Sequence, residues 1–167
     1  MSRNDNIQID STARVSAQAD IEVSILGTKL IVGAGSVIDS FVKIKPAGGT
    51  GDVIIGRGVT INSGCVIYSG NGILIGNDVS IAAGTVLAPV NHAYNQRERT
   101  IKDQRFAPSR GGIVIEDDVW IGAGCVLLDG SILRKGVVVG AMSLVRGELA
   151  SYGIFAGNPI RQIGWRE

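Results

Sequence analysis

The chain has 167 residues, of which 45% are apolar and only 5% aromatic, and its formal net charge is +1. This near-neutral charge gives no reason to expect a nucleic-acid partner, and no apolar run approaches the roughly 20 residues of a membrane span. Two cysteines, Cys65 and Cys125, do not make a disulfide framework, so we expect one cytoplasmic domain over residues 1–167.

The amino-terminal part carries the first traces of a six-residue period. Its opening, MSRNDNIQID, has no apolar segment typical of a secretory signal. Apolar residues then recur in two successive phases, at Ile9, Val15 and Ile21, and at Ile31 and Val37. The stretch KIKPAGGTGD, residues 43–52, contains Pro46 and predicts an insertion at a corner of the repeat.

Between residues 55 and 145 the period is regular, and an apolar residue leads each hexad. The twelve leaders are Ile55, Ile61, Ile67, Ile75, Ile81, Leu87, Ile115, Ile121, Leu127, Leu133, Val139 and Val145. Small or β-branched residues usually follow four positions later, as at Val59 and Cys65, and Gly or Ala often follows the leader directly, as at Gly56. This regularity predicts a solenoid of short strands.

Strand geometry explains the period. Side chains alternate between the two faces of a strand, so a leader and the small residue two positions before it both point inward. The glycine-rich positions after the leaders fit corners, where unusual backbone angles are cheapest. Three hexads close a triangular coil of about 18 residues, and about six coils stack by parallel pairing at about 4.8 Å.

The hexads of this chain, such as IGNDVS and WIGAGC, resemble the hexapeptide-repeat, left-handed β-helix family. The resemblance covers nearly the whole chain from Ile9 and implies an all-β fold, a left-handed parallel β-helix. The left hand comes from the resemblance alone, because crossover connections are generally right-handed. A right-handed parallel β-helix, with longer and less regular coils, is the alternative.

The repeat stops within VLAPVNHAYNQRERTIKDQR, residues 86–105, and resumes after residue 112. This interruption predicts a loop extruded from the coils at about 93–112, and the only histidine, His92, stands at its start. The loop contains five basic and two acidic residues: Arg97, Arg99, Lys102, Arg105 and Arg110, against Glu98 and Asp103. A solvated loop and a flap over an anionic ligand such as CoA are both open interpretations.

His92 follows IGNDVSIAAGTVLAPVN without a gap. In galactoside and maltose acetyltransferases and related sugar O-acetyltransferases, a similar segment ends in the catalytic histidine, before a loop and a WIG hexad. The resemblance therefore implies that His92 is the catalytic base, and the alternative is a loop histidine without a role. Neutral imidazole, with a reference pKa of about 6.5, can take the proton of a sugar hydroxyl as it attacks acetyl-CoA.

The same resemblance implies contacts to CoA after the loop. Trp120 matches a tryptophan beside the CoA and acceptor channel, and the alternative is a packing aromatic at a corner. Ala123 and Ala141 match positions whose main-chain amides contact CoA, where small residues permit close approach. Met142 departs from the GAGS sequence that is frequent in the family.

Two further residues match positions that bind ligands in the family. Arg161 lies in a short closing segment at about 151–167, whose sequence IFAGNPIRQIG resembles the end of the acetyltransferases. The resemblance implies that Arg161 contacts a CoA phosphate. Asn62 matches an acceptor-site asparagine of galactoside acetyltransferase. An exposed arginine and a corner asparagine are the alternatives. Ser69 and Gly70 replace the acidic pair that helps bind the acceptor there, so we expect a different acceptor.

The resemblance implies an acetyl-CoA-dependent O-acetyltransferase that acts on a sugar hydroxyl in surface-polysaccharide synthesis. It also implies a homotrimer with its clefts between subunits. The alternatives are an N-acetyltransferase of a nucleotide-linked amino sugar, a serine or xenobiotic acetyltransferase, and a non-catalytic scaffold. Gamma-class carbonic anhydrases bind a metal through three histidines, but this chain has one, so we expect no metal.

Overall fold

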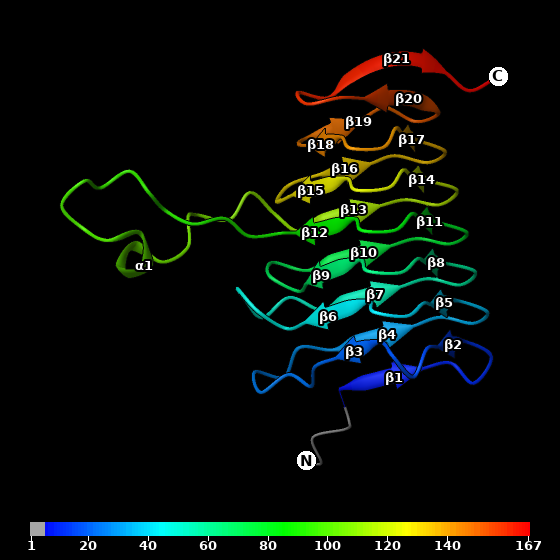
Figure 1. Ribbon diagram of the computed structural model, residues 1–167, viewed down its shortest axis with the longest axis horizontal. Helices are drawn as coiled ribbons and strands as arrows, with labels where there is room; N and C mark the ends of the chain where they lie inside the picture. The colour runs from blue at the N-terminus through cyan, green and yellow to red at the C-terminus, as the bar shows by residue number, and fades with distance from the viewer. Residues whose placement is uncertain (1–5) are drawn as a thin grey trace.

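In the computed structural model, residues 6–167 form a three-sided prism of stacked coils with one long segment projecting from its side (Figure 1). Residues 1–5, the start of the segment without signal character, lie outside the described residues. The prism is the expected left-handed parallel β-helix, with residues 7–9 and residues 161–165 at opposite ends of the stack.

Each side of the prism is one sheet, and within residues 6–167 the sheets contain seven, eight and six strands. The first sheet consists of β1 (Ile7–Ile9), β4 (Leu30–Val32), β7 (Val53–Ile55), β10 (Ile73–Ile75), β13 (Ile113–Ile115), β16 (Ile132–Leu133) and β19 (Glu148–Leu149). The second consists of β2 (Arg14–Val15), β5 (Val37–Ile38), β8 (Thr60–Ile61), β11 (Ser80–Ile81), β14 (Trp120–Ile121), β17 (Val138–Val139), β20 (Gly153–Ala156) and β21 (Arg161–Trp165). The third consists of β3 (Asp20–Ile21), β6 (Lys43–Lys45), β9 (Val66–Tyr68), β12 (Val86–Ala88), β15 (Val126–Leu128) and β18 (Leu144–Val145).

All pairings between coils are parallel except at the carboxyl end, where β21 turns back and pairs antiparallel with β20. A turn that contains Gly157, Asn158 and Pro159 connects these two strands. The only helix in the described part of the chain is α1 (Ile101–Gln104), a single turn in the projecting segment. Within residues 6–167 no helix has the length and apolar character needed to cross a membrane.

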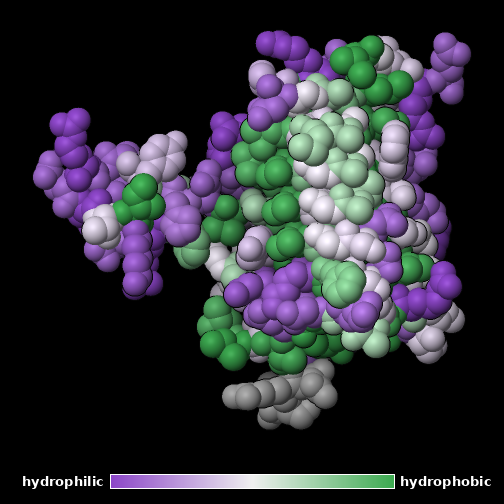
Figure 2. All heavy atoms as spheres, in the orientation of Figure 1, coloured by the Kyte–Doolittle hydropathy of each residue, from purple (hydrophilic) through white to green (hydrophobic). Residues whose placement is uncertain are grey.

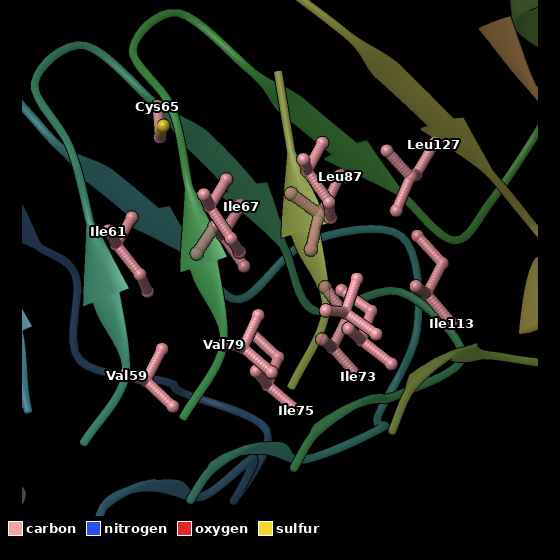
Figure 3. Packing of buried hydrophobic residues seen from close by; sticks show 14 of the residues in the cluster. Val59, Ile61, Cys65, Ile67, Ile73, Ile75, Val79, Leu87, Ile113 and Leu127 are labelled. Atoms are coloured by element: carbon pink, nitrogen blue, oxygen red, sulfur yellow. The ribbon is translucent and has the colours of Figure 1, made fainter. Parts of the chain in front are cut away.

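The predicted leaders fill the interior of the prism, and all twelve are at most 1% exposed. Figure 3 shows Ile61, Ile67 and Leu87 with their side chains turned into the interior between the sheets. The small residues of the second inward column are buried beside them. Cys65 and Cys125 are completely buried, burial raises the pKa of both thiols, and each sulfhydryl donates to a corner carbonyl at 3.2 Å.

The phase predicted for the second coil is wrong by one residue. Val32 and Ile38, not Ile31 and Val37, pair with the leaders of the next coil and lie buried. Each inward residue is preceded by another aliphatic residue, so the local sequence fits two registers. A shift of one residue moves every side chain to the opposite face. Gly33, which follows Val32 as Gly56 follows Ile55, marks the correct register of the first of these strands.

The insertion predicted at 43–52 starts too early. Residues 43–45 form β6, with Ile44 inward and the two lysines outward, and only residues 46–52 leave the coil. Nζ of the outward Lys43 forms an ion pair with Oδ2 of Asp20 on the preceding coil, at 2.6 Å. Charged residues therefore flank an inward residue without interrupting the strand.

The glycines after the leaders have a different role from the predicted one. A Cβ on Gly56 would lie 2.4 Å from the Gly76 carbonyl oxygen, so the close stacking of backbones requires glycine there. The left-handed backbone angles occur two residues later, as at Gly124 with φ +66°. Met142 takes this conformation with φ +59° on the next coil, and its amide still donates to the Ala123 carbonyl at 2.8 Å.

Outward side chains of the first and third sheets form apolar columns. In the first sheet five residues stack in register: Ile31, Ile54, Leu74, Val114 and Ile132. In the third sheet four do so: Val66, Val86, Val126 and Leu144. Figure 2 shows hydrophobic residues gathered on the prism, whereas the projecting segment is mostly hydrophilic.

Candidate active site

The projecting segment leaves the prism where β12 ends and returns where β13 begins, over residues 89–112. It departs from the corner between the third and first sheets, which we call the third corner. The segments 22–29 and 46–52 leave the coils at this same corner. The third corner therefore carries the long insertions that make the surface of the prism irregular.

His92 lies at the root of the projecting segment, where its two limbs pair. His92 and Phe106 form an antiparallel bridge, and the centroids of their rings are 5.1 Å apart. The Ala107 amide donates to the Asn91 carbonyl at 2.8 Å, next to this bridge. The backbone amide of His92 donates to Oδ1 of Asn91 at 2.9 Å. The imidazole is thus exposed on a paired, hydrogen-bonded piece of backbone.

Two glycines of the preceding coils support this root from below. A Cβ on Gly48 would lie 2.6 Å from Cγ1 of Val90, and one on Gly70 would lie 2.7 Å from the same atom. The absence of side chains at these two positions lets Val90 pack directly on the corner backbone. This packing holds the chain immediately before His92 against the prism.

His92 lines two depressions in the surface. The apolar depression has a volume of about 330 Å³ and is lined by Ala47, Gly48, Tyr68, Ala88, Val90, His92 and Phe106. The polar depression has a volume of about 230 Å³ and is lined by Asn91, His92, Tyr94, Ala107, Pro108, Arg110, Asp129 and Arg146. The imidazole is therefore accessible from an apolar side and from a side rich in hydrogen-bonding groups.

An ion pair fixes the returning limb of the segment in the polar depression. Nε and Nη2 of Arg110 donate to the two carboxylate oxygens of Asp129 at 2.9 and 2.7 Å. Asp129 is only 3% exposed, and these hydrogen bonds from Arg110 hold the pKa of its carboxyl below the ordinary value. The amide of Gly130 also donates to the Gly112 carbonyl at 3.1 Å. Nothing in the sequence distinguishes Asp129 from an ordinary turn aspartate, so sequence reasoning missed it.

We expect Asp129→Asn to lower the free energy of unfolding by about 1–3 kcal/mol at neutral pH, because it leaves Arg110 without its charged acceptor. Since the pair lowers the pKa of Asp129 in the folded state, its contribution is present above the unfolded-state pKa of about 3.9 and disappears in acid. Urea unfolding at several pH values measures the difference. The exposed Glu148→Gln, which removes a carboxylate from Arg134, should cost less than about 1 kcal/mol. Equal losses from the two variants would contradict the anchoring role.

The residues expected to contact CoA gather elsewhere, at the corner between the second and third sheets, which we call the second corner. Ala123 and Ala141 are exposed there on neighbouring coils, linked by the bond from Met142 to Ala123. In residues 6–167 the amides of Ala123 and Ala141 take no part in the hydrogen bonds between coils. Trp120 is 51% exposed on the adjoining strand β14.

Arg161 and Asn62 extend the second corner in both directions. Arg161 is exposed in β21 and pairs with Ala156, whose Cβ would lie 3.0 Å from a Cβ on Gly140. Asn62 lies at the same corner on an earlier coil, where its side-chain amide donates to the Ile81 carbonyl at 2.8 Å. This bond supports the stacking of coils, which was the alternative role for Asn62.

One chain does not bring all the predicted site residues together. His92 lies at the third corner, whereas Trp120, Ala123, Ala141, Arg161 and Asn62 lie along the second sheet and the second corner. Ser69 and Gly70 do lie at the third corner. Gly70 packs there against Val90 and Pro89. Residues 6–167 contain no group of three or more His, Cys, Asp or Glu side chains placed to hold a metal ion.

Comparison with known proteins gives relatives of two kinds. Residues 112–147 match the family model described as bacterial transferase hexapeptide (six repeats). The Escherichia coli K12 protein WbbJ, named for an O-acetyl transferase of lipopolysaccharide biosynthesis, is 29% identical over 142 residues, 82% of this chain and 69% of that protein. Gamma carbonic anhydrase 2 of Arabidopsis thaliana is 31% identical over 134 residues, 75% of this chain but only 48% of that protein.

Among solved structures, AntD from Bacillus cereus has the same fold. AntD is an N-acyltransferase whose crystal structure holds dTDP and 3-hydroxybutyryl-CoA. It superposes with a TM-score of 0.80, covering 96% of this chain and 83% of its own, at 23% sequence identity. The likeness concerns the architecture of the coils.

Proposed function

We propose that this chain is a hexapeptide-repeat acyltransferase that transfers an acetyl group from acetyl-CoA to a sugar hydroxyl, and the matching family model and the likeness to WbbJ support this. The observation that carries the proposal is the exposed imidazole of His92 on the rim of two depressions, at the paired root of the projecting segment. The name of WbbJ supports a hydroxyl acceptor in surface-polysaccharide synthesis. We propose a cytoplasmic location for this reaction.

In the proposed reaction His92 acts as general base. Its neutral imidazole accepts the proton of the acceptor hydroxyl while the hydroxyl oxygen attacks the thioester carbonyl of acetyl-CoA. The new C–O bond forms, the C–S bond breaks, and the proton passes to the departing CoA thiolate. Because the thioester is already activated, the rest of the rate comes from holding the two substrates in contact.

The second corner fits the CoA arm. Ala123 and Ala141 are exposed at successive steps of the stack, and their amides are not used in the hydrogen bonds between the described coils, so we propose that a chain lying along the corner bonds to both. Trp120 presents an indole beside them that can cover the pantetheine arm. Arg161, farther along, is the candidate for a phosphate contact, and Asn62, farther back, for an acceptor contact.

We expect Trp120→Ala to weaken CoA binding by about tenfold, because the pantetheine arm loses the apolar face of the indole. Calorimetric titration with CoA measures this change. Trp165→Ala removes another exposed indole, from β21, and should leave the affinity unchanged. Unchanged affinity in both variants would move the CoA site away from Trp120.

The separation of the candidate residues supports a homotrimer with shared sites. If the second corner of one copy faces the third corner of the next, Trp120 and the alanines meet His92 of the neighbour. The apolar outward columns of the first and third sheets supply surfaces for such packing. Three copies arranged cyclically complete three equivalent sites.

Sedimentation equilibrium should therefore give about three times the chain mass of 17.4 kDa. Mixing His92→Ala and Trp120→Ala chains should restore part of the lost activity, because some mixed sites receive both intact residues. A monomer with full activity would contradict the shared site.

Release of free CoA from acetyl-CoA, measured with a panel of sugars, amino sugars, serine and chloramphenicol, tests the proposed reaction. Ester formation on a sugar hydroxyl is the expected product. Formation of an amide on a nucleotide-linked amino sugar would identify the reaction as N-acetylation instead of O-acetylation. Absence of acceptor-dependent CoA release with all classes would favour a non-catalytic scaffold.

A further inference from the structure

The polar depression contains more hydrogen-bonding groups than the proposed proton transfer uses. Besides His92, its polar walls consist of Asn91, Tyr94, Arg110, Asp129 and Arg146. They come from three sources: the two limbs of the projecting segment, the turn after β15 and the end of β18. These segments lie far apart in the sequence, and the third corner brings them together.

The charges of the polar depression do not cancel. Arg110 and Asp129 form a two-bond ion pair, so together they contribute no net charge. Arg146 follows β18 on the next coil, is exposed, and has no ion-pair partner within residues 6–167. Its guanidinium leaves one unbalanced positive charge in the wall of the depression.

The neutral groups of the polar depression also favour an anion. Oδ1 of Asn91 already accepts a hydrogen bond from the His92 amide, so the free end of this side chain is its NH₂ donor group. Tyr94 adds a hydroxyl that can donate. A planar guanidinium with further donors around it matches the geometry of a carboxylate or a phosphate.

We propose that the polar depression binds an acidic group of the acceptor, a carboxylate or a phosphate, with Arg146 as its main ligand. This inference rests on the proposed function, because it assumes that the acceptor hydroxyl reaches His92 on the shared rim. The class of acceptor is then an acidic or phosphorylated sugar. The hydrogen bonds to Asp129 hold the guanidinium of Arg110 in a fixed orientation, so its remaining donors can face the acidic group.

The test is a calorimetric titration of the intact protein with three probes: glucose 1-phosphate, glucuronic acid and glucose. The wild type should bind at least one anionic probe about tenfold or more tightly than glucose. Arg146→Gln should weaken that binding by about 10- to 100-fold, the worth of a charge-assisted hydrogen bond, and leave glucose binding unchanged. Arg14→Gln, which removes an exposed arginine from β2 at the far end of the prism, should change none of the three affinities.

A preference for glucose 1-phosphate identifies a phosphate as the acidic group, and a preference for glucuronic acid identifies a carboxylate. Equal binding of the three probes by the wild type, or wild-type affinity in Arg146→Gln, would overturn the proposal. Binding needs no acetyl transfer, so His92→Ala should keep the preference for the anion. An anion preference in a protein that acetylates nothing would overturn the proposed function and leave this site standing.

Discussion

His92→Ala should lower the turnover of acetyl transfer by about 10² to 10⁴, the usual contribution of a general base. CoA affinity should change little, because the imidazole is proposed to contact the acceptor hydroxyl and the groups proposed for CoA lie at another corner. Folding should survive, since His92 is exposed and belongs to neither inward column.

Phe106→Leu is the matched control for this experiment. It removes the ring that lies 5.1 Å from the imidazole but keeps an apolar side chain at the pairing of the two limbs. A loss of severalfold is expected if Phe106 only orients His92. If His92→Ala stays folded, binds CoA normally and acetylates the acceptor at the wild-type rate, the general-base role is wrong. A similar large loss in both variants would assign the effect to the loop instead of the proton transfer.

The largest effect on stability is expected from a pair of adjacent isoleucines in β7. Ile55→Ala should cost about 2–5 kcal/mol of unfolding free energy, because Ile55 is 1% exposed and its removal leaves a cavity between three sheets. Ile54→Ala makes the same chemical change one residue earlier, on a side chain that is 37% exposed, and should cost about 1 kcal/mol or less.

Urea unfolding of both variants at one protein concentration measures this contrast. The common concentration matters because Ile54 belongs to an outward column that is proposed to pack against another copy. Similar losses at the two positions would mean that β7 does not alternate between core and surface as its pairing indicates. Concentration-dependent unfolding of Ile54→Ala alone would instead identify its column as an interface.

The fold could be predicted because its six-residue period is visible within short stretches of the sequence. A buried leader every six residues is visible where successive hexads continue without a slip, as from Ile75 to Ile81. The prediction failed at Ile31 and Val32, two adjacent aliphatic residues of which the second is inward, although the adjacent pair Ile54 and Ile55 was assigned correctly. There Val32 pairs with Ile55, 23 residues away in sequence, and the local sign of the inward face is Gly33, which follows Val32 as Gly56 follows Ile55.

The candidate site was harder to predict than the fold for two physical reasons. His92 is marked by an interruption of the period, but the Arg110–Asp129 pair depends on how the loop returns to the next coil. The glycines at positions 48 and 70 are visible in the sequence, whereas Val90 covering both of them is not. The second reason is that the expected residues lie on two corners of one prism, and a single sequence does not state how copies pack.

The projecting segment also has an energetic consequence for the assembly of the coils. Contacts between ordinary neighbouring coils join residues 20 apart, such as Arg57 and Asn77, whereas the contact of Asn77 with Asp117 across the interruption joins residues 40 apart. Doubling the length of a closed loop costs only about 0.6 kcal/mol of chain entropy. A solenoid can therefore accept a long excursion at a corner for less than the loss of one buried methylene, about 0.8 kcal/mol. The same arithmetic lets loops at the third corner change in length and sequence while the coils beneath them stay intact.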